Sequence, residues 1–423
     1  MIRTVKKNRK QFYVTVAVCV AAFWAGAASA WSAVEPDIVV LKQGDSSREY
    51  VVTGETWRDV QVLRIADGRK STLPQAGVAR VDYSDVPERY SLAITNIGRS
   101  RWLAAAADLE QALKNYDSGK NRSWIRQYAL YHLAECRRVL AELAADTAAL
   151  REAADTYAQL LRDVPDTKFK HAAMLAGARC ALKIAEMTED EEARATAAKE
   201  AEAAYTALAR AAAGDFKGEE YAKAREIWQR RARLGRAALD CILAGGAEEM
   251  RKAAGEARGL ASGADSSETG MEAMIWACRC ELAAGRMDGT DDASALETTR
   301  QVIKGIVASV RDENARNRLL VLAYSVIGGH YYELMNKTAR DDPARRNYGD
   351  EAALAYLRVA LLYPSTSGAE AECQDAIYRT ALIMRERGEF RLAGKLLLIM
   401  KQRYADSALW KNTGSKMLAE LPG

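Results

Sequence analysis

An alanine-centred pattern that recurs along most of the chain constrains the fold more than any other feature. In each copy an alanine is followed four residues later by an apolar or aromatic residue and seven residues later by another apolar one, so all three share one helix face. The seven copies are Ala105-Leu109-Ala112, Ala153-Tyr157-Leu160, Ala201-Tyr205-Leu208, Ala253-Ala257-Leu260, a weaker Ala295-Thr299-Val302, Ala352-Tyr356-Val359 and Ala393-Leu397-Met400. The pattern predicts seven amphipathic helices in series.

Each of these helices is expected to have a helical partner before it. From Pro87 onward alanine dominates, and Pro165 is the only proline between residues 91 and 342, a composition that favours long helices. Further helical stretches precede the alanine pattern, for example 124–143, 319–335 and 369–387. The repeating unit is therefore predicted to be a helix pair, and alanine lets paired helices approach closely.

The copies resemble the second helix of tetratricopeptide repeats (TPRs). A bulky residue stands three positions before the alanine at Trp102, Met250 and Phe390, and a proline stands twelve after it at Pro165 and Pro364. The resemblance implies a mainly α chain, an α-solenoid of about seven TPR-like antiparallel helix pairs over residues 87–406, whose first helices line a concave groove. Successive alanines lie 48, 48, 52, 42, 57 and 41 residues apart, against about 34 in a standard TPR, so longer helices or loops are expected. Residues 407–423 are predicted to form a C-terminal capping helix.

Residues 31–86 have a different pattern, with short runs rich in Val and Ile. We predict five strands at about 37–42, 48–53, 58–65, 71–73 and 78–83, with a hairpin turn at Ala66–Arg69 around Asp67-Gly68. This spacing resembles a small SH3-like β module that precedes helical repeats in some exported bacterial proteins. Its expected role is to cap the first helices, and the alternative is to dock a second partner.

Residues 1–30 match a signal peptide. Five basic residues lie in the first ten, an apolar run follows from Gln11, and Ala28 and Ala30 give a small-x-small cleavage site. We predict cleavage after Ala30 and an exported, periplasmic or cell-envelope location, with an uncleaved N-terminal anchor as the alternative. Without this segment, 56 basic residues face 57 acidic ones. A near-neutral chain argues against nucleic-acid binding through bulk charge.

No catalytic, cofactor or metal site is predicted. The sequence lacks HExxH, GxSxG, P-loop and GxGxxG motifs, and His132, His171 and His330 lack metal-ligand spacing. Six cysteines follow residue 30, all in expected first helices. We favour buried free thiols for them, with disulfides as the alternative that an oxidising compartment would permit.

Candidate partner-binding residues are aromatic and arginine side chains on expected first helices. One group is Arg126, Tyr128 and Tyr131, and the other surrounds Trp228 with Arg230 and Arg233. Tyr and Arg are common at binding hot spots, although a solvated helix face is the usual explanation of a run of arginines. The charged segment Lys337–Gly349 is expected to be a long surface loop.

The leading hypothesis is an exported, non-enzymatic scaffold that binds a protein or peptide partner along its concave face. Peripheral association with the cell envelope is allowed, but no transmembrane span is expected in the mature chain. One alternative is a structural component of a cell-envelope assembly. Another is a small-ligand or enzymatic groove, which would need a pocket lined by Glu, Tyr and Arg.

Overall fold

The computed structural model describes residues 36–42, 47–117, 122–261, 267–290, 293–364 and 366–422. The predicted signal peptide lies outside these residues. The chain divides into two compact units. Of the described residues, the first holds those from 36 to 53 together with Val60–Asp85, and the second holds Gly54–Asp59 together with those from Val86 onward.

The first unit is a five-stranded sheet in the order β4-β3-β2-β1-β5. Its strands are β1 (Asp37–Leu41), β2 (Ser47–Glu55), β3 (Asp59–Arg64), β4 (Lys70–Pro74) and β5 (Val78–Asp82), with a 3-10 turn at Gln75–Gly77. The strand β1 pairs antiparallel with both β2 and β5. The core is almost entirely valine, with Val39, Val60 and Val62 fully buried. Gly68 has the positive φ of the predicted hairpin turn.

The second unit is an array of fourteen described helices in consecutive pairs, followed by a terminal helix, which confirms the predicted fold class. The first helices of the pairs are α1 (Glu88–Gly98), α3 (Trp124–Ala144), α5 (Lys170–Met187), α7 (Ala222–Leu243), α9 (Glu268–Asp288), α11 (Glu313–Lys337) and α13 (Glu370–Glu386). The second helices are α2 (Trp102–Lys114), α4 (Thr147–Asp163), α6 (Glu191–Asp215), α8 (Ala247–Ala261), α10 (Ala293–Ser309), α12 (Pro343–Leu362) and α14 (Phe390–Tyr404). A π-helical turn at Trp410–Gly414 continues into α15 (Ser415–Glu420).

The seven pattern alanines all lie on second helices, and none is more than 6% exposed. In two copies the pattern tyrosine packs on a glycine of a first helix, Tyr356 on α11 of its own pair and Tyr205 on α7 of the next pair. Tyr205 lies against Gly235, and Tyr356 lies against Gly328, where an added Cβ would be 2.7 Å from the ring. The recurring alanine and aromatic positions therefore mark where second helices pack against first helices, either of their own pair or of the next one.

The loop predicted over Lys337–Gly349 is much shorter than expected. The helix α12 begins at Pro343, because the Asp342 carboxylate accepts a hydrogen bond from the Ala344 N–H and caps the helix. Proline suits the first helical position because its missing N–H would have no intrahelical partner there. The many charged residues of this segment suggested a loop, although a helix begins within it.

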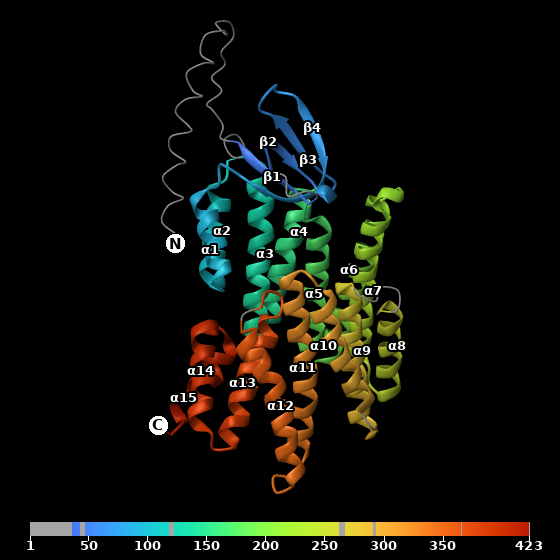
Figure 1. Cartoon of the computed structure of the whole chain (residues 1–423), viewed down its shortest axis with the longest axis vertical. Helices are drawn as coiled ribbons and strands as arrows, with labels where there is room; N and C mark the ends of the chain where they lie inside the picture. Colours follow the sequence, from blue (N-terminus) through green and yellow to red (C-terminus); the bar gives the residue numbers. More distant parts are fainter. Residues whose placement is uncertain are drawn as a thin grey trace, which may run out of the picture. The chain divides into compact units, whose positions relative to one another are not determined.

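The array closes on itself. The first helices contact one another in the order α5–α7, α7–α9, α9–α11 and α11–α13, and α13 in turn contacts α3. Figure 1 shows α13 adjoining the lower end of α3, although more than 200 residues separate them in the chain. The concave side of the array is therefore bounded by six first helices, from α3 to α13.

Two of the six cysteines after residue 30 are joined. Cys241 on α7 and Cys280 on α9 form a disulfide with a Cα–Cα distance of 6.1 Å, within the usual range for such a bond. Cys136, Cys180, Cys278 and Cys373 are buried and free. The preference for buried free thiols is correct for these four and wrong for the joined pair, since sequence spacing gives no sign that α7 and α9 lie side by side.

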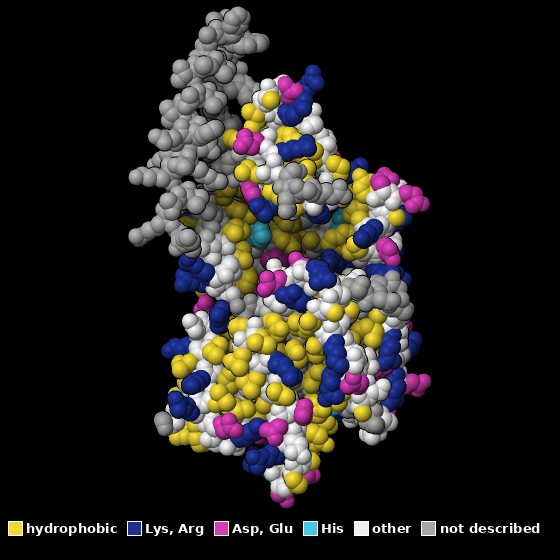
Figure 2. All heavy atoms as spheres, viewed as in Figure 1, with side chains coloured by type: hydrophobic (Ala, Val, Ile, Leu, Met, Phe, Trp, Pro, Cys, Tyr) yellow, Lys and Arg dark blue, Asp and Glu magenta, His cyan; other side chains and the backbone are white. Residues whose placement is uncertain are grey.

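Among the described residues, no helix combines the length and hydropathy needed to cross a bilayer. One outer surface is nevertheless apolar. Figure 2 shows hydrophobic side chains gathered over the part of the view where α11, α12 and α13 lie. Leu354, Leu361 and Leu362 of α12 are 49%, 60% and 64% exposed.

Candidate functional site

The space enclosed by the first helices contains a cavity of about 600 Å³. Its wall includes side chains from α3, α5, α7, α9, α11 and α13, with Tyr205 of α6 and Tyr356 of α12 reaching in from behind. Aromatic groups on the wall also include Tyr131, Trp228 and Trp276. The volume lies in the range of ligand pockets, roughly 300–1,000 Å³.

Every first helix from α3 to α13 contributes an arginine to this wall. These are Arg138, Arg179, Arg231, Arg279, Arg286, Arg318 and Arg379. The carboxylates of the wall are Glu135, Glu142, Glu186, Glu272, Glu333, Glu372 and Asp375. The cavity wall therefore carries many charges of both signs in nearly equal number, and the buried ones among them require pairing.

Two ion pairs form a ladder across the cavity between α5 and α9, which are not sequential first helices. Arg179 of α5 lies 3.4 Å from Glu272 of α9, and Arg279 of α9 lies 2.9 Å from Glu186 of α5. On each helix the two charged residues are seven apart, which places them on one face two turns apart. We call these four residues the cross-cavity ladder.

The ladder carboxylates each have a second basic partner. Arg318 lies 2.7 Å from Glu272, and Lys183 lies 2.8 Å from Glu186. Burial alone would raise the pKa of both acids, but their basic neighbours outweigh it and lower each pKa to about 2. Both carboxylates therefore stay ionised at any physiological pH.

Glu372 of α13 behaves in the opposite way. Burial raises its pKa, with Lys183 opposing and Glu142 adding to the rise. His330 on α11 is almost fully buried, and burial together with Arg286, whose Nη1 lies 3.2 Å from His330 Nδ1, lowers its pKa to about 4. The imidazole is thus neutral near pH 7.

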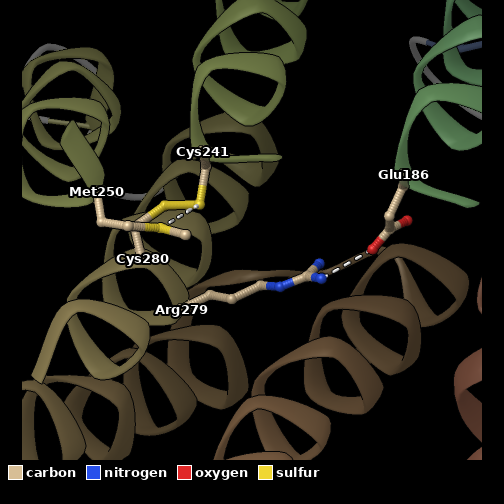
Figure 3. The surroundings of a disulfide bond; sticks show 5 residues. All are labelled: Glu186, Cys241, Met250, Arg279 and Cys280. Carbon is tan, nitrogen blue, oxygen red and sulfur yellow. Dashed lines mark hydrogen bonds and ion pairs between the residues drawn. A yellow bond between two sulfur atoms is a disulfide. The ribbon is translucent and has the colours of Figure 1, made fainter. Parts of the chain in front are cut away.

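The disulfide lies directly beside the ladder. Figure 3 shows the Cys241–Cys280 bond next to Arg279, whose guanidinium reaches across to Glu186. Met250 Sδ lies 3.9 Å from Cys241 Sγ on the other side of the bond. Arg279, which makes one rung of the ladder, immediately precedes Cys280, which is tied covalently to α7.

Two of the six candidate residues predicted from the sequence lie on the cavity wall, Tyr131 and Trp228. The Tyr131 ring stacks on Phe169 with centroids 4.1 Å apart, and burial raises its pKa. The Arg231 guanidinium lies 5.0 Å from the centroid of the Trp228 ring.

Arg126 and Tyr128 lie on α3 but are not part of the cavity wall. Arg126 forms an ion pair with Asp163 at 2.6 Å. The Tyr128 hydroxyl donates a hydrogen bond to Glu55 Oε2 at 2.7 Å, and Lys168 Nζ donates to the same hydroxyl at 2.6 Å. These contacts hold the Gly54–Asp59 segment against the helices of the second unit.

Arg230 and Arg233 also lie away from the wall. Arg230 pairs with Glu226 one turn earlier on α7 at 2.7 Å, and Arg233 is exposed. The two clusters predicted from the sequence are therefore not brought together as units.

Sequence reasoning missed the cross-cavity ladder. Arg179 and Glu186, or Glu272 and Arg279, look like charges on a solvated helix face. The signal that could have identified them is their complementarity, because Arg-x6-Glu on one first helix faces Glu-x6-Arg on another at the same spacing.

Within the described ranges, no group of three or more His, Cys, Asp or Glu side chains has the arrangement of a metal site. Ser325 is a cavity hydroxyl, and its Oγ has no hydrogen-bond partner among the described residues. A serine nucleophile would need a base within hydrogen-bond reach.

No protein-family model and no curated protein sequence matches the chain. Among solved structures, the chain is similar to a "circular tandem repeat protein with novel repeat topology and enhanced subunit contact surfaces". That match is 14% identical with a TM-score of 0.25, and it covers 78% of this chain and 92% of the other. A likeness at this TM-score carries no inference about function.

Proposed function

We propose that the chain is an exported, non-enzymatic scaffold that binds a short peptide segment of a partner protein in the cavity enclosed by its first helices. The observation that carries the proposal is the cavity of about 600 Å³, lined by arginine, glutamate, tyrosine and tryptophan. A peptide presents charged, polar and apolar groups together, and a wall of this composition can meet all three.

The contact between α13 and α3 restricts the kind of partner that fits the concave face. Because α13 contacts α3 and six first helices bound the cavity, we favour a ligand smaller than a partner helix. A short extended segment or a chain end can enter the cavity from one end. The same cavity fulfils the condition set for the small-ligand alternative, so a small ligand is the outcome to be distinguished from a peptide.

We also propose that the helix pairs are divergent TPRs, that the sheet is a small SH3-like module, and that the chain is exported. Helix pairs with a buried alanine pattern support divergent TPRs, and the return of β5 to pair with β1 supports a small SH3-like module. The Cys241–Cys280 disulfide supports export through the predicted signal peptide, because disulfides persist in oxidising compartments.

The proposal is tested with a purified chain and a mixed-sequence heptapeptide library, followed by ultrafiltration and mass spectrometry of the retained peptides. Ala172 lies on the cavity wall, so Ala172→Trp should fill part of the space. Ala195 is exposed on α6, and Ala195→Trp is the matched control. The proposal is supported if the original chain and Ala195→Trp retain peptides equally well and Ala172→Trp retains fewer. Equal retention by both variants, or no retention by the original chain, would refute it.

A second candidate is a structural part of a cell-envelope assembly, favoured by the exposed leucines of α12. Light scattering coupled to size-exclusion chromatography tests it. A monomer at every concentration, unchanged by Leu361→Glu, argues against assembly through this face.

A further inference from the structure

In the cross-cavity ladder the two arginine side chains are more exposed than the two glutamate side chains. The side chains of Arg179 and Arg279 are 45% and 48% exposed, whereas those of Glu272 and Glu186 are 12% and 28% exposed. A molecule that enters between α5 and α9 therefore meets guanidinium groups first. Each guanidinium has five N–H donors and uses few of them on its buried partner.

The fold does not need these two arginines to neutralise the buried acids. Arg318, only 13% exposed, already pairs with Glu272, and Lys183 pairs with Glu186. An additional ion pair made by a half-exposed arginine contributes roughly 0–1 kcal/mol. Arg179 and Arg279 are thus placed where they stabilise little and remain able to bind an anion.

The spacing of the two arginines sets the spacing of the anionic groups they can hold. Their rungs are seven residues apart on parallel helices, which is about 10 Å along the axis. An extended chain rises about 3.3 Å per residue, so three residues span the same distance. Side chains at positions i and i+3 of an extended chain point to opposite sides, and the two arginines come from opposite helices.

The wall between the rungs also suits such a segment. Trp276 lies between Glu272 and Arg279 on α9, and the Arg279 guanidinium is 4.7 Å from the centroid of its ring. The indole offers an apolar surface for the residues between two charged side chains.

We propose that the cavity is specific for an extended acidic segment with two carboxylates three residues apart, one bound by Arg179 and the other by Arg279. This inference rests on the proposed peptide-binding function and adds the chemical class of the ligand. Arg179 and Arg279 are the residues that determine specificity.

The experiment measures fluorescence anisotropy of labelled, end-blocked peptides with the full chain. The peptide cores are Glu-Ala-Ala-Glu, the neutral Gln-Ala-Ala-Gln, the basic Lys-Ala-Ala-Lys and the misplaced Glu-Glu-Ala-Ala. Unlabelled free glutamate is the competitor that represents a small ligand. The protein variants are Arg179→Gln, Arg279→Gln and the control Arg258→Gln, which removes a half-exposed arginine that pairs with Glu281 away from the cavity wall.

The expected result is that Glu-Ala-Ala-Glu binds the original chain and Arg258→Gln alike. Each ladder substitution should weaken its binding about tenfold or more, because each removes one charge-assisted contact. The misplaced acidic peptide should bind more weakly than the correctly spaced one. Circular dichroism should show unchanged helix content in both variants, since Arg318 and Lys183 still neutralise the buried acids.

Four results would overturn the inference. If neutral or basic peptides bind as well as the acidic one, the peptide-binding function stands and the acidic specificity falls. If the acidic peptide binds but neither ladder substitution weakens it, the ligand lies elsewhere, and if free glutamate competes as well as the peptide, the site takes a small molecule. If no peptide binds and the heptapeptide library is also empty, the proposed function falls with it.

Discussion

Replacement of Glu370 by glutamine should change how the stability of the array depends on pH. Glu370 opens α13, the helix that closes the array on α3, and it is only 2% exposed. Its Oε2 accepts a hydrogen bond from the Gly368 N–H at 3.0 Å, while its Oε1 is buried without a hydrogen-bond partner among the described residues. Burial raises the Glu370 pKa to about 7 from 4.5, against the attraction of Arg138 and with a small further rise from Glu142.

The sign and size of the effect follow from this shift. A carboxyl whose pKa is raised on folding holds its proton more tightly in the folded chain. Its contribution to stability is complete below the unfolded value of 4.5 and is lost as the pH rises through about 7. A shift of this size corresponds to about 3 kcal/mol at 1.36 kcal/mol per unit. Glutamine resembles the protonated acid and has no such loss.

Urea unfolding followed by circular dichroism at pH 5, 6, 7 and 8 measures the difference. From pH 5 to pH 8 the original chain should lose roughly 2–3 kcal/mol relative to Glu370→Gln. Glu351→Gln, at an exposed position of α12, is the control and should follow the original chain. Parallel pH profiles for the original chain and Glu370→Gln would refute the reasoning, because they would mean that Glu370 is ionised in the folded chain throughout this range.

Three further predictions concern packing and covalent links. Reduction of the Cys241–Cys280 disulfide should raise the intact mass by two hydrogens, and Cys241→Ser should lower the free energy of unfolding by about 4 kcal/mol, the loop-entropy value for a separation of 39 residues. Gly328→Ala should destabilise the chain by about 1–3 kcal/mol, because the new Cβ meets the Tyr356 ring. Gly177→Ala has open space around it and should stabilise the chain by up to about 1 kcal/mol. Thermal melts of the two variants measure both changes, and equal shifts would contradict the prediction. Tyr157→Phe removes the buried hydrogen bond to Glu135 and should lower stability by about 1–3 kcal/mol in urea, and an unchanged midpoint would show that the contact contributes nothing.

The helix pairs could be predicted because their contact leaves a strong mark on the sequence. Alanine at the centre of each contact, such as Ala153 or Ala352, lets two helix axes approach, and any larger side chain there would force them apart. The same steric demand explains why Tyr356 faces Gly328. The strands could also be predicted from the sequence, because a small sheet with one buried face needs alternating valines such as Val60 and Val62.

The closure of the array could not be predicted in the same way. It depends on the small rotation between successive pairs, summed over six of them, and no single residue determines that sum. The contact between α13 and α3 also leaves no periodic pattern, because it occurs once. For the same reason Arg126 and Tyr128 share a helix with Tyr131 but lie away from the cavity, which only the closed geometry defines.

Closure also changes what the charges on the first helices can do. On an open solenoid, pairs such as Arg179–Glu272 would be surface ion pairs, screened by water and of little consequence. Inside the closed array their carboxylates are largely buried and remain ionised because basic groups surround them. An incoming ligand must then match this set of charges, and a ligand of the wrong charge is disfavoured. The closed array thus gives these first-helix charges a role in selecting the ligand that they would lack on an open groove.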